Sequence, residues 1–405
     1  KMIRKYKPEL VICNAFDDRH IDHGKGSKLV SDACFLSGLL KIDTKIEDSK
    51  STPIELTASE GFVNPIGFYD PTPRFSWKLP PQSNQQVQTG YQIQVATTDT
   101  FDSETLVWDS GKVMSDNNAW VQYQGSTLQS RQKVYWRART WGQQASQEAQ
   151  QVSSWSELQF IELGLLSNQD WQAKWIGHSE TDATPFYTRK RFELEQPIQQ
   201  ARLYVTAKGV FQPFLNGKKI SKDVMTPGWT PYHKRIETLT YDVSDFMDKG
   251  QNTLAASLAE GWHTGRIFHP TQQERVKPMR LLAQLEVEFE DGTKQLIATN
   301  DNWQSTNQGP IREASNYDGE TYDANMEMQG WNNTEFRPKR PEQTWSNVYV
   351  EPLDSQVKLK PKRHTAPRAT LTIPAIEIVS VNDGVAIFDM GQNMVGVPEI
   401  KVPAK

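Results

Sequence analysis

The chain has 405 residues, more than one hydrophobic core usually serves, so we expect two or three domains. Hydrophobic residues make up 37% of it and charged residues 23%, and the formal net charge is -4. This acidic balance argues against a nucleic-acid or anionic-membrane surface, so we expect neither nucleic acid nor membrane as a partner. The sequence contains no apolar run long enough to cross a bilayer, and no export signal is visible at its start.

The cysteines and tryptophans divide the chain into two compositions. Cys13 and Cys34 both lie in the first 50 residues, whereas all 13 tryptophans come from Trp77 onward. The lack of cysteine after Cys34 excludes a disulfide framework for the rest of the chain. Because the two parts differ so sharply, we interpret the chain as chimeric.

Residues 1–48 have the pattern of a short α/β fragment. A mostly apolar run at 9–13 predicts a strand buried on both faces, and apolar residues between 26 and 39 follow helical spacing. Such a small fragment cannot bury a parallel strand by itself, so we expect flanking structure to be missing. Residues 49–53 close a polar stretch that predicts a linker.

From residue 54 onward the pattern is typical of antiparallel β-structure. Segments 91–95 and 135–139 alternate apolar and polar residues, as half-buried strands do. Turn signals recur about every ten residues, which is typical of a sandwich of short strands. With a last strand expected at 155–160, these features predict a first β domain at 54–165.

A second β domain is predicted at 166–355. Its expected strands are 186–192, 201–206, 210–215, 252–259 and 281–289. Asn216-Gly217 and Asp291-Gly292 follow two of these strands and are strong hairpin signals.

The remaining residues, 356–405, are expected to be a linker and the start of a truncated third β domain. Their basic run at 358–363 is interpreted as a connection, like the earlier stretch 337–341. A strand pair is expected at 384–389 and 395–402.

Ordered strings from residue 54 onward resemble bacterial α-L-rhamnosidases. Among them are Asn-Pro-Ile-Gly at 64–67, Tyr-Trp-Arg-Ala-Arg at 135–139, Pro-Gly-Trp-Thr-Pro-Tyr at 227–232, Glu-Gly-Trp-His-Thr-Gly at 260–265 and Asp-Met-Gly-Gln-Asn-Met-Val-Gly at 389–396. The resemblance implies a mainly β chain. In order, it implies a fibronectin III-like sandwich, a jelly-roll-like sandwich and the start of a further β domain.

The same resemblance implies that the catalytic part of the enzyme lies elsewhere. The family continues into an (α/α)6 barrel, and the barrel's acidic string Asp-Cys-Pro-x-Arg-x-Glu-Arg is absent from this chain. An inverting glycosidase needs a carboxylic acid and a carboxylate base about 6.5–9.5 Å apart. We therefore expect this chain to be inactive alone, with the missing C-terminal barrel and rhamnose-containing glycans as its partners. The family implies bacterial glycan degradation and leaves the compartment, periplasmic or cytoplasmic, open.

The first segment resembles a different family, the zinc-dependent N-acetylglucosaminyl deacetylases of the bacillithiol type. The resemblance lies in Asn-Ala-Phe-Asp-Asp-Arg-His-Ile-Asp-His at 14–23. It implies that His23 corresponds to a zinc ligand and that His20 and Asp22 support the chemistry. The family's other ligands, from an Ala-His-Pro-Asp-Asp string, are absent, and zinc catalysis needs about three protein ligands. We therefore interpret the group as a relic without zinc.

Four side chains in the rhamnosidase-like strings are candidates for a sugar-stacking platform: Trp229, Tyr232, Trp262 and His263. Asn216 and Glu260 are candidates to orient hydroxyl groups beside them. Alternatively, Trp229 and Trp262 fill the core of the sandwich, because tryptophan is highly buried on average. For Asn216, the alternative is a role confined to its tight turn.

No cofactor is expected from the sequence, with calcium as the alternative to test. Asp318, Glu320 and Asp323 form a carboxylate cluster of the kind that binds calcium through oxygen. The preferred interpretation is a solvated loop that needs no ion.

Three functions from different classes remain open. The first is the N-terminal scaffold and carbohydrate-binding portion of an α-L-rhamnosidase. The second is a stand-alone carbohydrate-binding β-sandwich, and the third is a remnant deacetylase. We favour the first, because the rhamnosidase-like strings cover residues 54–405 in order.

Overall fold

The computed structural model describes residues 52–80, 87–143, 151–265, 277–382 and 385–399. Within these ranges the regular elements are 26 strands and three short 3-10 turns, so the prediction of a mainly β chain is confirmed. None of the described helical turns is long or apolar enough to cross a membrane. The predicted α/β fragment, with His20, Asp22 and His23, lies outside the described residues.

The described chain forms two compact units. Unit 1 comprises residues 52–61, 74–125 and 135–159. Unit 2 comprises residues 62–73 and 126–134 together with the chain from 160 onward. Segments at 62–73 and 126–134 thus leave the first predicted domain and pack within unit 2.

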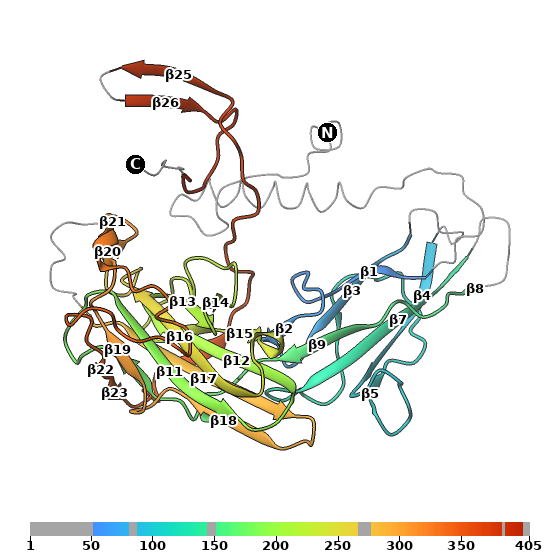
Figure 1. Ribbon diagram of the computed structural model, residues 1–405. Helices are drawn as coiled ribbons and strands as arrows, with labels where there is room; N and C mark the ends of the chain where they lie inside the picture. Colours follow the sequence, from blue (N-terminus) through green and yellow to red (C-terminus); the bar gives the residue numbers. More distant parts are fainter. Residues whose placement is uncertain (1–51, 81–86, 144–150, 266–276, 383–384, 400–405) are drawn as a thin grey trace. The chain divides into compact units, whose positions relative to one another are not determined.

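Unit 1 contains a three-stranded sheet and most strands of a six-stranded sheet (Figure 1). The three-stranded sheet contains β1 (Ile54–Ala58), β3 (Arg74–Lys78) and β6 (Val121–Gln122). The six-stranded sheet has the order β2 (Ile66–Phe68), β9 (Gln159–Leu163), β7 (Lys133–Gln143), β4 (Val87–Ala96) and β5 (Leu106–Asp109), with β8 (Gln151–Val152) beside β7. In it, β4 pairs antiparallel with β5 and β7, and β8 pairs with β7. Phe75 of β3 and Trp136 of β7 are buried with ring centroids 4.4 Å apart, so aromatic side chains join the two sheets.

Unit 2 contains a seven-stranded and a six-stranded sheet, which Figure 1 shows as the green to red-orange strands. The seven-stranded sheet has the order β23 (Tyr349–Glu351), β10 (Trp175–Gly177), β17 (Arg280–Phe289), β12 (Ile198–Lys208), β15 (Arg235–Asp242) and β24 (Lys358–Pro361), with β18 (Lys294–Ala298) beside β17. The six-stranded sheet has the order β14 (Lys218–Lys219), β13 (Val210–Leu215), β16 (Gly250–Ala259), β11 (Phe186–Leu194), β19 (Gln304–Thr306) and β22 (Ser346–Asn347).

The shorter elements complete the described chain. They are β20 (Ile311–Ser315), β21 (Gly319–Tyr322), β25 (Glu377–Asn382) and β26 (Val385–Asp389), with 3-10 turns η1 (Asn168–Asp170), η2 (Ser244–Phe246) and η3 (Ala324–Met326). β2 and β9 pair in parallel, whereas β20–β21 and β25–β26 are antiparallel hairpins.

The main core of unit 2 contains side chains from both large sheets, which identifies the unit as a β-sandwich. Alternation along β12 places Leu203 and Val205 in that core, while Tyr204 joins a smaller core on the opposite face. The smaller core also contains Trp171, Trp175 and other apolar side chains. One sheet therefore has apolar packing on both faces, and the second face carries the site described below.

The two predicted hairpin turns are present. Asn216 and Gly217 have φ values of 48° and 83°, and Leu215 pairs directly with Lys218 across them. Positive φ at both central residues is what a type I′ turn requires, and asparagine and glycine adopt it at least cost. Gly292, with φ of 81°, occupies the second turn, between β17 and β18.

Three expected elements differ in the structure. The strand expected at 155–160 begins only at Gln159. The basic run 358–363, interpreted as a connection, contains β24, which pairs in parallel with β15. Leu359 and Pro361 of β24 are buried while Lys358 and Lys360 are exposed. Four residues are too few for that alternation to be distinguished from a charged loop.

The expected strand at 395–402 is also wrong over its described residues, which have no regular structure. β26 instead pairs with β25, upstream of it. The side chains of Val395 and Val397 are fully or nearly fully exposed, so within the described chain they do not pack against other residues as strand residues would.

Candidate functional site

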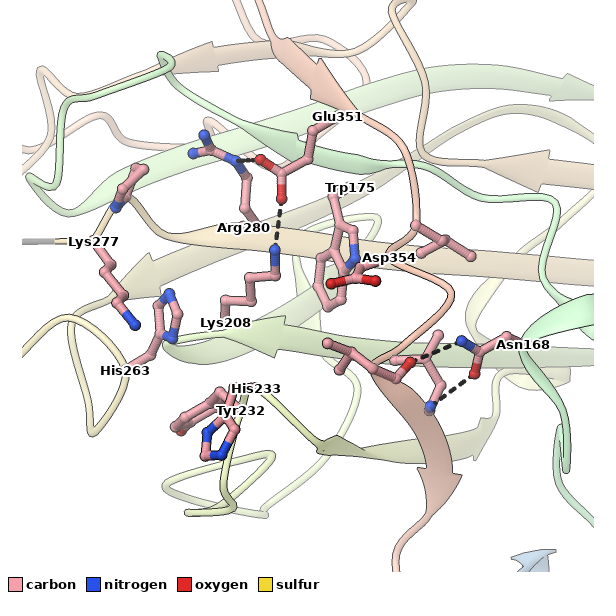
Figure 2. Close-up of a pocket in the computed structure, with 14 residues that line it drawn as sticks. Asn168, Trp175, Lys208, Tyr232, His233, His263, Lys277, Arg280, Glu351 and Asp354 are labelled. Atoms are coloured by element: carbon pink, nitrogen blue, oxygen red, sulfur yellow. Dashed lines mark hydrogen bonds and ion pairs between the residues drawn. The ribbon is translucent and has the colours of Figure 1, made fainter.

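A pocket of about 320 Å³ opens on the face of the seven-stranded sheet that carries the smaller core (Figure 2). This volume is at the lower end of the range for small-ligand pockets. Strands β10, β12, β17 and β23 contribute to its walls, together with loops that precede β15, follow β16 and follow β23. Its polar lining consists of Asn168, Lys208, His233, His263, Lys277, Arg280, Glu351 and Asp354.

Two cations meet across neighbouring strands at the centre of the pocket. Lys208 of β12 and Arg280 of β17 are register partners. Like charges directly opposite each other destabilise a sheet unless something neutralises them. Glu351 of β23 does so: its Oε1 accepts from Lys208 Nζ at 2.6 Å and its Oε2 from Arg280 Nε at 3.0 Å. Figure 2 shows the carboxylate between the two cations.

The backbone around Arg280 fixes the orientation of its guanidinium. Nη1 donates to the carbonyl oxygens of Ser179 and Met279, and Nη2 donates to that of Glu180. Gly177 leaves room for this arrangement, because a Cβ there would lie 2.5 Å from Arg280 Nη1. The arginine is therefore a rigid part of the pocket wall.

The charges of this cluster shift the pKa values of its neighbours. Burial alone would raise the pKa of Glu351, but hydrogen bonds and charge from Lys208 and Arg280 outweigh it and lower that pKa. Burial, with further contributions from Lys208, Lys277 and Arg280, lowers the pKa of His263 to about 3. At neutral pH the pocket therefore contains an ionised Glu351 and an uncharged His263.

Two of the four predicted aromatic residues come together at this pocket. Tyr232 and His263, from loops that lie before β15 and after β16, have ring centroids 4.9 Å apart at an interplanar angle of 68°. The Tyr232 hydroxyl donates to the carbonyl of Gly228, and Thr264 Oγ1 donates to the carbonyl of Lys277. Short contacts within and between these loops thus hold the two rings at the pocket.

The two predicted tryptophans lie in the same loops but do not line the pocket. Trp229 is 57% exposed, so the alternative that it fills the sandwich core is wrong. Trp262 is half-buried. Their positions leave the sugar-stacking role as a proposal, with Trp229 the more accessible ring.

Asn216 and Glu260 have structural partners away from the pocket lining. Asn216 Nδ2 donates to Asn252 Oδ1 at 2.7 Å, and its Oδ1 accepts from the backbone of Thr253 at 2.8 Å. Glu260 Oε2 accepts from the backbone of Ala314 at 2.8 Å. Burial raises the pKa of Glu260, yet the carboxylate is engaged in fastening β20 rather than facing this pocket.

The carboxylate cluster proposed for calcium does not form a compact ligand set. Asp318 accepts a hydrogen bond from Ser315 Oγ at 3.1 Å, and Glu320 belongs to the exposed strand β21. Asp323 precedes η3 and accepts a hydrogen bond from the backbone N–H of Asn325 within that turn. Across the described part of the chain, no group of three or more His, Cys, Asp or Glu side chains is arranged to hold a metal ion.

The pocket has the chemistry of a binding site rather than of a glycosidase centre. Its two carboxylates are Glu351 and Asp354. A general acid for glycoside cleavage needs a raised pKa, whereas that of Glu351 is lowered and both its oxygens are paired. Charged donors, a paired acceptor and aromatic rings instead suit the hydroxyl groups and apolar faces of a small polar ligand.

Sequence reasoning missed Lys208, Arg280 and Glu351, because they come from three strands that are far apart in the chain. The sequence signal that could have identified Lys208 and Arg280 was a charged residue at the end of an otherwise apolar strand. Lys208 closes β12 and Arg280 opens β17, and both strands are otherwise mostly apolar.

Comparisons with known proteins assign both parts of the described chain. The family model for the Rha78A-like, N-terminal immunoglobulin domain matches residues 54–167, and that for the alpha-L-rhamnosidase N-terminal domain matches residues 196–370. An alpha-L-rhamnosidase of Alteromonas sp. (strain LOR) is 46% identical over 374 residues, which cover 89% of this chain and 39% of that protein. An alpha-L-rhamnosidase of Formosa agariphila is 46% identical over 363 residues, which cover 86% of this chain and 38% of that protein.

A solved structure shows the same architecture. The alpha-L-rhamnosidase from Dictyoglumus thermophilum superposes with a TM-score of 0.73 at 31% identity, covering 85% of this chain and 39% of that one. The chain thus spans about 39% of the length of these relatives. Residues 54–370 therefore contain the two N-terminal domains, immunoglobulin-like and rhamnosidase-type, of the α-L-rhamnosidase family.

Proposed function

We propose that this chain is the non-catalytic N-terminal portion of an α-L-rhamnosidase and that its pocket binds rhamnose-containing glycans. The observation that carries the proposal is the contact between Tyr232 and His263 in a pocket that also contains Lys208, Arg280 and Glu351. The relatives named above are α-L-rhamnosidases, which supports rhamnose as the sugar. Hydrolysis is assigned to a catalytic barrel encoded with this chain, which is its expected partner.

The exposure of the pocket loops supports a ligand that extends beyond one ring. Trp229 lies on the same loop as Tyr232, and Trp262 is the neighbour of His263. Sugars present apolar C–H faces that pack against aromatic rings, so an exposed Trp229 is suited to a second sugar unit. We propose that Asn216 and Glu260 support the site indirectly, through their hydrogen bonds to Asn252, Thr253 and Ala314.

The domain boundaries are part of the proposal. We place a fibronectin III-like domain at 54–165, a jelly-roll-like domain at 166–355 whose sheet β24 (Lys358–Pro361) completes, and the start of a further domain in the rest of 356–405. The matches at 54–167 and 196–370 support the first two. Residues 1–48 are proposed to be a deacetylase-like fragment without zinc, on the resemblance of the string at 14–23 alone. Stoichiometric zinc in the purified chain would contradict that assignment.

Calorimetric titration with L-rhamnose and methyl α-L-rhamnoside tests the binding proposal. Tyr232→Ala is expected to weaken binding of both sugars, and because Tyr232 also packs against the smaller core, thermal melting checks that the fold is intact. Trp120→Ala is the matched control, because Trp120 is 53% exposed and belongs to unit 1. Equal sugar binding by the two variants, or no binding by the unaltered chain, would contradict the proposal.

A stand-alone carbohydrate-binding protein is the second candidate. It is favoured by the fact that every residue lining the pocket belongs to unit 2, so the site needs no other domain to be complete. The reading frame after the codon for Lys405 separates the two candidates. Sequence that encodes a helical barrel supports the enzyme portion, and a stop codon supports the binding protein.

A further inference from the structure

A second, larger groove lies on the six-stranded sheet of unit 2, beside β11 and β19. It has a volume of about 710 Å³. The strands contribute Arg189, Arg191 and Gln304, and the segment between η3 and β22 forms the other wall. Figure 1 shows β11 and β19 as neighbouring strands of that sheet.

The lining of this groove is strongly cationic. Five basic side chains contribute to it: Arg189, Arg191, Arg337, Lys339 and Arg340. Among the described residues, no aspartate or glutamate lines the groove, and none of its five cations forms an ion pair. Glu335 and Glu342 belong to the same segment but not to the lining. Such a concentration of unpaired charge attracts anions.

Arg189 anchors the segment that carries the other cations. It is 6% exposed, and its Nη1 and Nη2 donate to the carbonyl oxygens of Trp331 and Asn333, each at 2.8 Å. Burial and the charges of Arg191 and Arg337 lower the pKa of Arg189 to about 10. An anion in the groove would relieve this repulsion.

Aromatic rings form the apolar part of the same wall. The Arg189 guanidinium lies 5.3 Å from the Phe336 ring centroid and 5.8 Å from that of Trp345. Trp345 Nε1 is buried and has no hydrogen-bond acceptor among the described residues. Buried donors without acceptors are uncommon, so this N–H marks an unsatisfied polar group in the wall of the groove.

We propose that this groove is a second carbohydrate site, which binds an acidic glycan through its sulfate or carboxylate groups. Arginine side chains match such groups with paired donors, while Phe336 and Trp345 offer apolar surface to sugar rings. Apart from Arg189 and Arg191, the groove lies within the stretch that matches the alpha-L-rhamnosidase N-terminal domain, which favours a glycan over a nucleic acid as the anionic ligand, and the test below includes single-stranded DNA as the competing probe. This proposal depends on the proposed function in one respect, namely that the anionic ligand is a glycan.

The test compares probes that differ only in charge. Calorimetric titration of the full chain uses dextran sulfate, unsulfated dextran of the same length, oligogalacturonate and single-stranded oligothymidylate. We expect one or both acidic glycans to bind and neutral dextran not to bind. Raising the salt concentration from about 0.05 M to about 0.5 M should weaken the binding, because exposed charges are screened. The stronger of the two acidic probes identifies the group, sulfate or carboxylate.

Substitutions then locate the binding. Arg191→Gln with Arg337→Gln removes two exposed groove charges and leaves the anchoring Arg189 in place; we expect affinity to fall at least about tenfold, because charged hydrogen bonds are lost. Lys249→Gln with Lys294→Gln removes two exposed charges outside the groove and should leave affinity unchanged. Thermal melting of each variant checks that the fold is intact.

Three outcomes would overturn the proposal: no acidic glycan binds, both double variants bind equally, or oligothymidylate binds as tightly as the glycans. Titration of methyl α-L-rhamnoside into the same variants separates this proposal from the previous one. The groove variant should retain rhamnoside binding, since neither substituted residue lines the pocket at Lys208 and Glu351.

Discussion

Among the described residues of unit 2, three arginines are almost fully buried, and a carboxylate neutralises two of them but not the third. Arg202 and Arg280, 6% and 2% exposed, each pair with a glutamate. Arg189 is 6% exposed and bonds only to backbone carbonyl oxygens, with further cations beside it. The paired arginines hold elements of the unit together. The unpaired one leaves a net positive charge at a groove, which is a property suited to binding.

The same contrast separates the two candidate sites. In the pocket, Glu351 offsets Lys208 and Arg280, and the site suits a neutral ligand with many hydroxyl groups. In the groove no carboxylate in the described lining offsets the basic side chains. Of the four predictions below, the first two test whether pairing, rather than burial alone, sets this difference, and the last two test the residues assigned to the pocket and its loops.

The largest effect is expected at the most deeply buried ion pair. Arg202 Nε donates to Glu162 Oε1 at 2.5 Å, and their side chains are 7% and 3% exposed. Glu162→Gln would leave Arg202 with only a neutral partner and Asp242, so we expect about 3–5 kcal/mol of destabilisation. Urea denaturation measures it.

The matched control for that variant is Glu288→Gln. Glu288 pairs with Lys294 on the surface, so its loss should cost no more than about 1 kcal/mol. Similar costs for Glu162→Gln and Glu288→Gln would show that buried pairing is unimportant in unit 2.

Glu351→Gln is expected to have the second-largest effect. It preserves the shape of the side chain but leaves Lys208 opposite Arg280 without a neutralising charge. Because Glu351 is 26% exposed, we expect about 2–3 kcal/mol of destabilisation, less than for a fully buried pair. The variant should also gain affinity for dextran sulfate; unchanged stability and unchanged affinity would refute the contrast drawn between the sites.

His263 should make stability depend on pH. Its pKa is about 3 in the folded chain, whereas an unperturbed histidine has a pKa of 6.5, so the unfolded state takes up the proton first as pH falls. Its contribution is complete above pH 6.5 and is lost towards pH 3. Between about pH 6.5 and pH 4.5 we expect a loss of about 2 kcal/mol.

His263→Gln tests this assignment, because glutamine does not titrate. The variant should show a flatter stability profile than the unaltered chain over that interval, while Glu351, whose pKa is lowered, stays ionised in both. Parallel profiles for the two proteins would mean that another group causes the pH dependence.

The smallest effect on stability is expected at Trp229. Its side chain is 57% exposed, so Trp229→Ala should change the free energy of unfolding by no more than about 0.5 kcal/mol. Binding of a rhamnose-containing oligosaccharide should nevertheless weaken. A large loss of stability would restore the interpretation that this ring packs in the core.

The sequence predicted the elements whose signals are local. Alternation at 135–139 predicted part of β7 (Lys133–Gln143), and Asn216-Gly217 marked the turn that follows β13 (Val210–Leu215). β24 was missed because its two buried positions, Leu359 and Pro361, gain their burial from a parallel partner distant in the chain. A pairing of that kind leaves only a four-residue alternation, too short to predict a strand.

The candidate site was predictable only in part, for the same reason. Tyr232 and His263 stand in recognisable strings, and the structure brings them together. Lys208, Arg280 and Glu351 depend on the register of three strands, which composition and periodicity do not supply. The groove around Arg189 likewise could not be predicted, because its walls are β11 and the segment before β22, which are far apart in the chain.

The central claim is that this chain binds glycans while the acids that cleave them lie elsewhere. Incubation of the purified 405-residue chain with 4-nitrophenyl α-L-rhamnoside tests it most directly. We predict nitrophenol release no faster than in a protein-free blank. Release above the blank that scales with protein concentration and is lost in a Glu351→Gln variant would contradict the claim.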